Sequence, residues 1–170
     1  MTDPHTGAPG LHAALVRHTG YLLSRLGWYA ARRFSEQLQS LELTPRMWGA
    51  LNVLEAESPV SQQQLGRSIG MDPSSMVGTI DELEGLGLVE RRANPSDRRA
   101  HALHLTDAGR QTLNAGRLRA KRAQDELLAP LSAAERAQLH ALLLKLAVGT
   151  EAADPGAVRR EPSGAPPPAA

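Results

Sequence analysis

The chain has 170 residues, an apolar fraction of 41% and a formal net charge of +1, a length that suits one domain with tails. It contains no cysteine, which excludes disulfides, thiolate metal sites and thiol redox sensing and is compatible with the cytoplasm. The sequence has no apolar run of about 18 residues and no signal-peptide pattern at its start, so we predict a cytoplasmic protein without a membrane partner.

The chain is predicted to begin with a tail and a long helix. Residues 1–10 are rich in Gly, Pro, Thr and Ala, which favours a disordered N-terminal tail. Residues 11–40 have helical periodicity and are predicted to form one amphipathic helix. Its apolar stripe contains Leu11, Leu15, His18, Leu22, Leu26 and Tyr29.

The next helix is predicted to start at a cap followed by proline. Thr44 can accept a hydrogen bond from a free backbone N–H, and Pro45 suits the first helical position. The buried face of this helix is expected to hold Met47, Leu51 and Leu54, and the helix should end at Ser58-Pro59.

Two short helices follow, and together they predict a helix-turn-helix. Ser61 and Gln64 form a capping box for the first, which should end at Gly70. The second should be capped by Asp72 with Pro73 at its first position. Neither is long enough to be stable alone, so we expect them to pack together. The shared core should contain Leu65, Ile69, Met76 and Ile80, and Leu83 and Gly87 continue the same face.

A β-hairpin is predicted directly after this second helix. LVERR reads as the outward strand, ANPSD (residues 93–97) as the turn and RRAHALHL as the return strand, in which apolar residues alternate. A capped helix followed by an arginine-rich hairpin suggests a winged helix-turn-helix at about 44–106. The fold class is therefore predicted as mainly α with a small β-hairpin wing, the helix entering a major groove and the wing an adjacent minor groove.

The C-terminal third is predicted to hold two more helices. The first runs from Thr106 to about Leu128, and Gly109 and Gly116 weaken its propensity, so packing must hold it. Ser132 and Glu135 form a capping box for the last helix. This helix carries Leu139, Leu142, Leu143 and Leu146 on one side. Residues 150–170 are rich in Ala and Pro and are predicted to be a disordered tail.

The outer helices, at about 11–40 and 107–149, have more apolar surface than one winged helix can cover. We therefore predict a helical dimerisation region and a homodimer. A two-fold dimer would place two recognition helices about 34–36 Å apart on a pseudo-palindromic site. The alternative is that these leucines only close the core of the monomer.

The distribution of charge predicts double-stranded DNA as a partner. Residues 89–122 hold nine Lys and Arg against three Asp and Glu, whereas residues 36–90 hold two against nine. The positive field thus lies on the hairpin and the following helix, although a solvated basic helix face remains the alternative. The two Trp, two Tyr and one Phe all precede residue 49, which argues against base stacking on RNA or single strands.

Only the N-terminal half of the recognition helix is expected to face DNA. Asp81, Glu82 and Glu84 make the second half negative, and phosphates would repel it. Val77 could touch a thymine methyl group, and Gly78 permits close approach, so direct readout should be modest. The alternative is that Ser74 and Ser75 only support the helix cap. The candidate DNA contacts on this helix are Pro73, Ser74, Ser75, Val77, Gly78 and Thr79.

Residues 83–109 carry a family resemblance in three motifs: LExxGLVERR, NPxDRR and LxLTxxG. These motifs resemble those of the MarR family of winged-helix transcriptional regulators, and the helix order over residues 11–149 is similar. The resemblance implies that Arg99 inserts into the minor groove and that Asp97 supports its guanidinium. Arg98 then points to the other face of the strand, toward phosphate, and Arg91 is a further candidate DNA contact.

The resemblance also implies a pocket for a small aromatic or phenolic ligand between the first two predicted helices, which carry the aromatic residues, and the DNA-binding lobe. The candidates are Trp28, Tyr29, Arg46 and Trp48. The alternative is that these side chains are core and interface packing. Urate-responsive members have an acidic residue after the Trp of the second helix, where this chain has Gly49, so a urate response is not expected.

No catalytic or metal-binding pattern was found among the six histidines or elsewhere, so we predict no enzyme activity and no cofactor. The sequence predicts a dimeric, sequence-specific, double-stranded DNA-binding transcriptional regulator. We expect it to be a repressor that a small aromatic or phenolic ligand releases. The alternatives are a ligand-independent regulator or activator, and a winged helix that contacts proteins without binding DNA.

Overall fold

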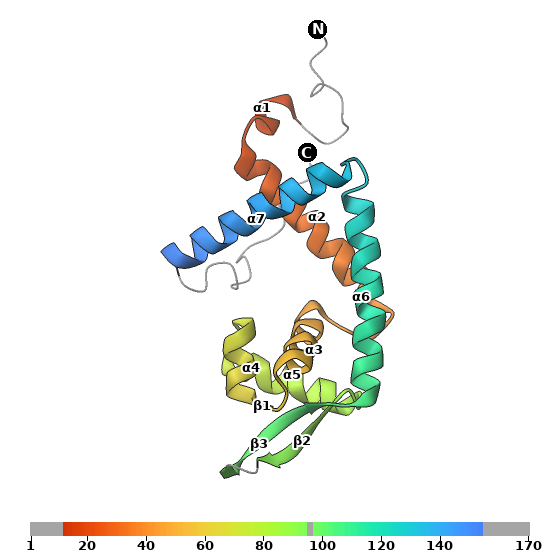
Figure 1. Cartoon of the computed structure of the whole chain (residues 1–170), viewed down its shortest axis with the longest axis vertical. Coiled ribbons are helices and arrows are strands. Elements are labelled where there is room, and N and C mark those ends of the chain that lie inside the picture. Colours follow the sequence, from red (N-terminus) through yellow and green to blue (C-terminus); the bar gives the residue numbers. More distant parts are fainter. Residues whose placement is uncertain (1–11, 95–96, 155–170) are drawn as a thin grey trace.

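The computed structural model of the chain describes residues 12–94 and 97–154. The lower part in Figure 1 is a lobe made of α3, α4, α5 and the sheet, and α6 rises from it to the region of α2 and α7. The elements in chain order are α1 (Ala13–Val16), α2 (Thr19–Gln39), α3 (Pro45–Glu57), β1 (Val60–Ser61), α4 (Gln62–Ile69), α5 (Pro73–Gly85), β2 (Val89–Asn94), β3 (Asp97–Leu105), α6 (Asp107–Leu127) and α7 (Ala133–Ala153). The fold is a winged helix-turn-helix with helical extensions, as predicted.

The predicted helix caps are confirmed by hydrogen bonds. The Thr44 hydroxyl accepts from the N–H of Met47 at 3.2 Å, and the Ser61 hydroxyl accepts from that of Gln64 at 3.2 Å. Gly70 ends α4 with a left-handed φ of 69°, which glycine adopts without strain. The predicted caps Asp72 and Ser132 also accept backbone hydrogen bonds, because each bond joins residues two or three apart and depends on local sequence alone.

The prediction of one helix over residues 11–40 was wrong. The chain breaks between α1 and α2, where Arg17 ends the first helix and His18 is extended, with φ −99° and ψ 109°. Thr19 and Gly20 begin α2, and both have low helix propensity. None of the α1 residues is buried, so no tertiary packing bridges this weak point.

The predicted hairpin is confirmed, and a third strand joins it. The sheet has the order β1-β3-β2, with Val60 paired to Leu103. The turn is shorter than the predicted segment 93–97, since Asn94 and Asp97 pair within the strands after an irregularity at Ala93. The missed strand β1 has only two residues, too few to show a period.

The core lies between α5, the sheet and the inner ends of α2, α3 and α6. The predicted inner face of α5 is confirmed, because Met76, Ile80 and Leu83 are buried. Gly87, predicted on the same face, lies beyond the end of α5 with a φ of 69°. Leu38 of α2 and Leu113 of α6 join this cluster, so both outer helices are anchored in the lobe.

Two glycines let α6 approach the lobe closely. A Cβ at residue 109 would fall 2.1 Å from the carbonyl oxygen of Leu88, and one at residue 116 would fall 2.8 Å from the indole of Trp48. Both positions thus require glycine. Packing therefore compensates for the low helix propensity, as predicted.

The last helix is longer than predicted and largely unpacked. α7 continues to Ala153, so the predicted start of the tail at residue 150 was wrong, and residues 155–170 lie outside the described range. None of its 21 residues is buried. Figure 1 shows α7 crossing α2 at the end of the molecule remote from the sheet. Its exposed apolar residues are Leu142, Leu143, Leu144, Leu146 and Val148.

Candidate nucleic-acid interface

The N-terminus of α5 is fixed by Asp72. One carboxylate oxygen, Oδ1, accepts from the N–H of Ser74 at 3.1 Å and from that of Ser75 at 3.0 Å. The Ser74 hydroxyl also donates to it at 2.6 Å, and this bond is the largest reason why the pKa of Asp72 lies well below its usual value. The Ser74 side chain therefore supports the helix cap, and its contact with DNA stays a prediction.

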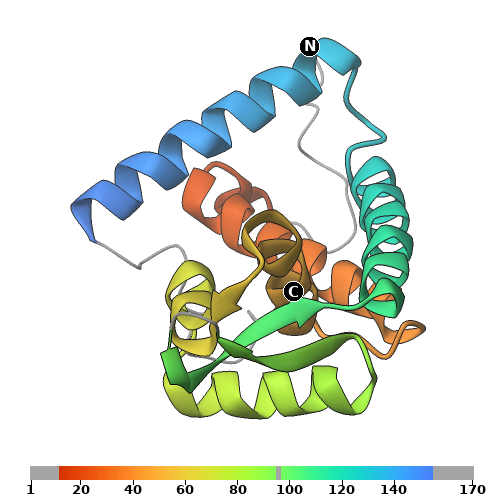
Figure 2. The ribbon, with the colours of Figure 1, turned by 60° about the horizontal axis from the view of Figure 1, so that its bottom comes forward.

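The outer face of α5 exposes most of the predicted contacts. Figure 2 shows this helix running along the edge of the molecule beside the sheet. Pro73, Val77 and Gly78 are exposed. Thr79 is not available for DNA, because it is only 8% exposed and its hydroxyl donates to the carbonyl of Ser75 at 2.9 Å. Thr79 lies on the side of the helix that faces the core.

A crevice of about 500 Å³ separates the other side of α5 from the start of α3. Arg46 and Thr44 line it from α3, and Gly78 and Glu82 line it from α5. Arg46 was predicted to line an effector pocket. It lies instead beside the helix that the sequence assigns to DNA.

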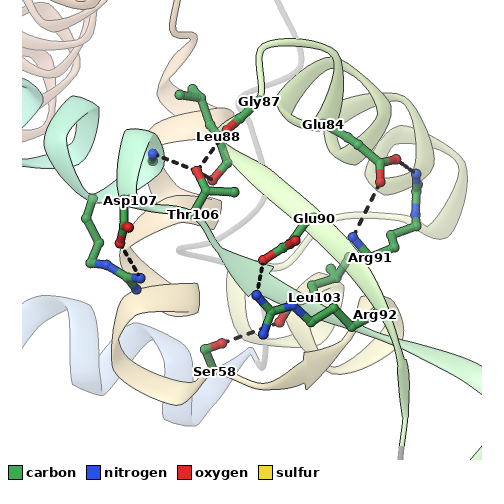
Figure 3. A network of polar contacts seen from close by, with 12 residues as sticks. Ser58, Glu84, Gly87, Leu88, Glu90, Arg91, Arg92, Leu103, Thr106 and Asp107 are labelled. Atoms are coloured by element: carbon green, nitrogen blue, oxygen red, sulfur yellow. Dashed lines mark hydrogen bonds and ion pairs between the residues drawn. The ribbon is translucent and has the colours of Figure 1, made fainter.

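Arg91 of β2 is held by two carboxylates of α5. Its Nη2 lies 2.6 Å from Oδ1 of Asp81, and its Nη1 pairs with Glu84. Figure 3 shows the second contact from close by. The bond to Asp81, with the nearby charge of Glu84, raises the pKa of Arg91. The prediction that Arg91 contacts DNA is therefore replaced by a role in joining the wing to the recognition helix.

The tip of the wing carries the remaining predicted contacts. The backbone of Asp97, Arg98 and Arg99 belongs to β3, but their side chains lie outside what the structure describes. Further along the strand, Leu103 and Leu105 are buried and His101 is exposed. The assignments of Arg98 and Arg99 to phosphate and minor groove thus stay predictions.

Thr106 links the start of α6 to the loop between α5 and β2. Its hydroxyl oxygen lies 2.8 Å from the carbonyl oxygen of Gly87 and 3.1 Å from that of Leu88, and it accepts from the N–H of Gly109 at 2.9 Å (Figure 3). The sequence predicts Thr106 as the start of this helix but not its contacts with the loop before β2. These bonds therefore connect the first turn of α6 to the loop before β2.

A second cavity, of about 530 Å³, opens between α2, α3, α6 and α7. Trp48 and Phe34 form part of its apolar wall, and their rings meet edge to face with centroids 5.1 Å apart. The indole N–H of Trp48 is buried without a hydrogen-bond partner among the described residues. A ligand that enters here would meet an aromatic wall and the far end of α6.

Two arginines, not noticed in the sequence, line this cavity. Arg33 pairs with Glu126 of α6 at 2.6 Å and with Glu36 at 3.0 Å, which raises its pKa. Arg136 donates from Nε to the carbonyl of Leu131 at 3.0 Å and is 35% exposed. Arg136 also lies 3.7 Å from Asp125, which lines the cavity as well. The cavity is thus mainly apolar, with two arginines that are each paired with a carboxylate of α6. Helical period alone could not find them, since they come from α2 and α7.

The four predicted pocket residues do not come together. Trp48 lines the cavity, Arg46 lines the crevice beside α5, and Trp28 and Tyr29 lie on the outside of α2. Trp28 is 38% exposed, with the guanidinium carbon of Arg32 at 5.8 Å from its ring centre. The sequence predicts that aromatic residues lie on these two helices. It does not show how α2 is rotated, and this rotation decides which of its aromatic side chains face the cavity.

The described residues contain no cluster of His, Asp or Glu able to hold a metal ion, and none of their helices could cross a bilayer.

A family model described as "MarR family" matches residues 41–100. A transcriptional regulatory protein for the hcr operon of Thauera aromatica is 33% identical over 150 residues, with 84% of this chain and 90% of that protein covered. The chain belongs to the MarR family. It is therefore a MarR-family transcriptional regulator.

Two solved structures of similar regulators contain a bound DNA duplex or a bound small molecule. The transcriptional repressor CouR bound to a 23-mer DNA duplex is 34% identical, with a TM-score of 0.71 over 79% of this chain and 96% of that one. CouR from Rhodococcus jostii RHA1 bound to p-coumaroyl-CoA is 30% identical, with a TM-score of 0.67 over 80% and 96% of the two chains. This MarR-family chain shares their winged-helix fold.

Proposed function

We propose that this protein is a homodimeric repressor that binds a pseudo-palindromic duplex operator and leaves it when a small aromatic or phenolic anion binds. The observation that carries the proposal is the exposed N-terminal half of α5, capped by Asp72 and joined to the wing through Arg91. A helix presented in this way has the shape needed to enter a major groove while the wing reaches the adjacent minor groove. The DNA-bound structure of CouR supports this assignment.

The proposed DNA contacts are Pro73, Ser74, Ser75, Val77 and Gly78 in α5, with Arg98 and Arg99 on the wing. Arg46 joins them from α3 as a phosphate contact. Thr79 and Arg91 are left out, because one is buried and the other is paired with acids. Asp97 keeps its proposed role in supporting Arg99. Direct readout by α5 is modest in this arrangement, so shape and the wing arginines contribute much of the specificity.

Dimerisation is proposed through α2 and α7. Both helices expose large apolar side chains along their outer faces, for example Leu26 at 54% and Leu146 at 55%. Monomeric proteins rarely leave so many large apolar side chains exposed on two helices, and such surfaces often mark protein–protein contacts. A two-fold axis through these helices would cover it and give the two α5 helices a fixed separation.

The cavity between α2, α3, α6 and α7 is the proposed effector site. Its apolar wall with Phe34 and Trp48 suits an aromatic ring. An anionic group of the ligand would bind Arg33 and Arg136 by replacing their present carboxylate partners, Glu126 and Asp125. A neighbour in the family binds p-coumaroyl-CoA, which combines such a ring with anionic groups. Binding would act by favouring a dimer whose α5 helices no longer match successive grooves.

The DNA part of the proposal is tested by footprinting on the duplex upstream of the protein's own coding region. We expect protection of two half-sites about one helical turn apart. The affinity should fall steeply as salt rises, because phosphate contacts release counterions. A binding constant that barely changes with salt, or no protected site, would favour a protein-contact module instead.

The effector part is tested by tryptophan fluorescence. Trp28→Phe leaves Trp48 as the only tryptophan, so the signal reports the cavity. Aromatic acids and their coenzyme A thioesters should change this signal and release DNA. Arg136→Ala should weaken both effects, whereas Arg32→Ala, outside the cavity, should not. A regulator that ignores every such compound while binding DNA would be ligand-independent.

A further inference from the structure

Val77 is an apolar side chain exposed on the helix that is proposed to read DNA. Over residues 41–93 and 101–105, the large apolar side chains left exposed are Val77, at 45%, and Leu86, at 39%. Leu86 lies at the C-terminal cap of α5, whereas Val77 lies in the half that faces the groove. Valine is less favourable than alanine in a helix, so folding alone gives no reason for it here.

The groups around Val77 have little hydrogen-bonding capacity to spare. Ser74, three residues before it on the same face, donates its hydroxyl to Asp72 at 2.6 Å. Asp81, four residues after it, is paired with Arg91 at 2.6 Å. At Gly78 a Cβ would meet no atom within 4 Å, so no neighbouring side chain covers the backbone there. Val77 is therefore an exposed apolar side chain whose polar neighbours on this face, Ser74 and Asp81, already have hydrogen-bond partners.

We infer that Val77 reads the C5-methyl group of a thymine in each half-site of the operator. That methyl is the apolar feature that base edges offer in the major groove, and a branched aliphatic side chain can pack on it. Gly78 permits the approach, because no side chain beside Val77 would hold the helix away from the bases. The inference rests on the proposed function, since it requires α5 to lie in a major groove.

The test replaces thymines of the footprinted operator one at a time by deoxyuridine, which removes only the methyl group. Affinity is measured by fluorescence anisotropy at one salt concentration. We expect one position per half-site to lower the affinity about four-fold, and about fifteen-fold when both half-sites are changed. Val77→Ala should bind the normal operator more weakly and should no longer distinguish thymine from uracil at that position.

Leu86→Ala is the matched control, because it removes the other exposed apolar side chain of the lobe and should keep the sensitivity to the methyl group. Val77 is exposed, so its variant should keep the melting temperature of the parent protein. Tight operator binding that ignores every deoxyuridine, or a penalty that persists in Val77→Ala, overturns this inference and leaves the proposed function standing. Absence of specific binding to any duplex overturns both.

Discussion

Arg91 of β2 lies with its Nη2 atom 2.6 Å from a carboxylate oxygen of Asp81 in α5, and the same guanidinium pairs with Glu84 one turn further along that helix. The Arg91 side chain is only 26% exposed, so water screens these pairs less than those on the open surface. This contact holds the wing against the recognition helix. It also offsets part of the negative charge of these two carboxylates, which would otherwise repel phosphate more strongly.

Arg91→Ala should therefore weaken both the fold and DNA binding. The loss in the free energy of unfolding should be on the order of 1 kcal/mol, measured by urea denaturation. Adding Asp81→Asn should restore part of the DNA affinity, because it removes one of the unpaired charges, but not the stability. Arg92→Ala serves as a control, since Arg92 pairs with Glu90 in its own strand and is 60% exposed. Equal effects of the two arginine variants would contradict this role.

Gly116→Ala should destabilise the protein. The added methyl would fall 2.8 Å from the indole of Trp48, which is itself packed against Phe34 and has to move. Overpacking of this kind costs about 1–3 kcal/mol, more than the gain in helix propensity. Thermal unfolding gives the measurement. Gly49→Ala is the opposite case, because its methyl meets no atom within 4 Å, and it should be neutral or stabilising.

The cap of α5 should make stability depend on pH in the acid range. The hydroxyl of Ser74, with further bonds from Ser75, lowers the pKa of Asp72 below its ordinary 3.8. A carboxyl with a lowered folded-state pKa stabilises the fold above about pH 4 and loses this effect as the pH falls further. Asp72→Asn keeps an acceptor for the cap but cannot ionise. The wild-type protein should therefore be more stable than this variant at pH 7, and the difference should vanish at the lowest pH values.

The apolar face of α7 should hold the dimer together. Leu142 and Leu146, one turn apart, are 52% and 55% exposed in the single chain. Changing both to Glu should produce a monomer in light scattering with unchanged helix content, and operator affinity should fall with it. Lys145→Ala, next to Leu146 but without an apolar side chain to bury, should remain dimeric. A wild-type protein that is already monomeric at micromolar concentration would contradict the interface.

The family comparison and the sequence both indicate a winged helix, but only the three-dimensional structure shows the cavity that we propose as the effector site. The residues around the wing could be recognised from short motifs, because strand, turn and cap signals repeat within a few positions. The proposed effector cavity could not. Its lining comes from four helices, and the helical period of α2 shows that one face is apolar without showing which neighbour covers it.

The sequence alone determined the starts of most helices and the inner face of α5, since a cap or a turn of helix involves residues three or four positions apart. The tertiary structure decided everything that depends on chain segments meeting. It added β1 to the sheet, turned Trp28 outward and Trp48 inward, and paired Arg91 with Asp81, ten residues away, and Arg33 with Glu126, 93 residues away. An arginine in a sequence shows a charge but no partner, and only the folded backbone brings the partner within a hydrogen bond.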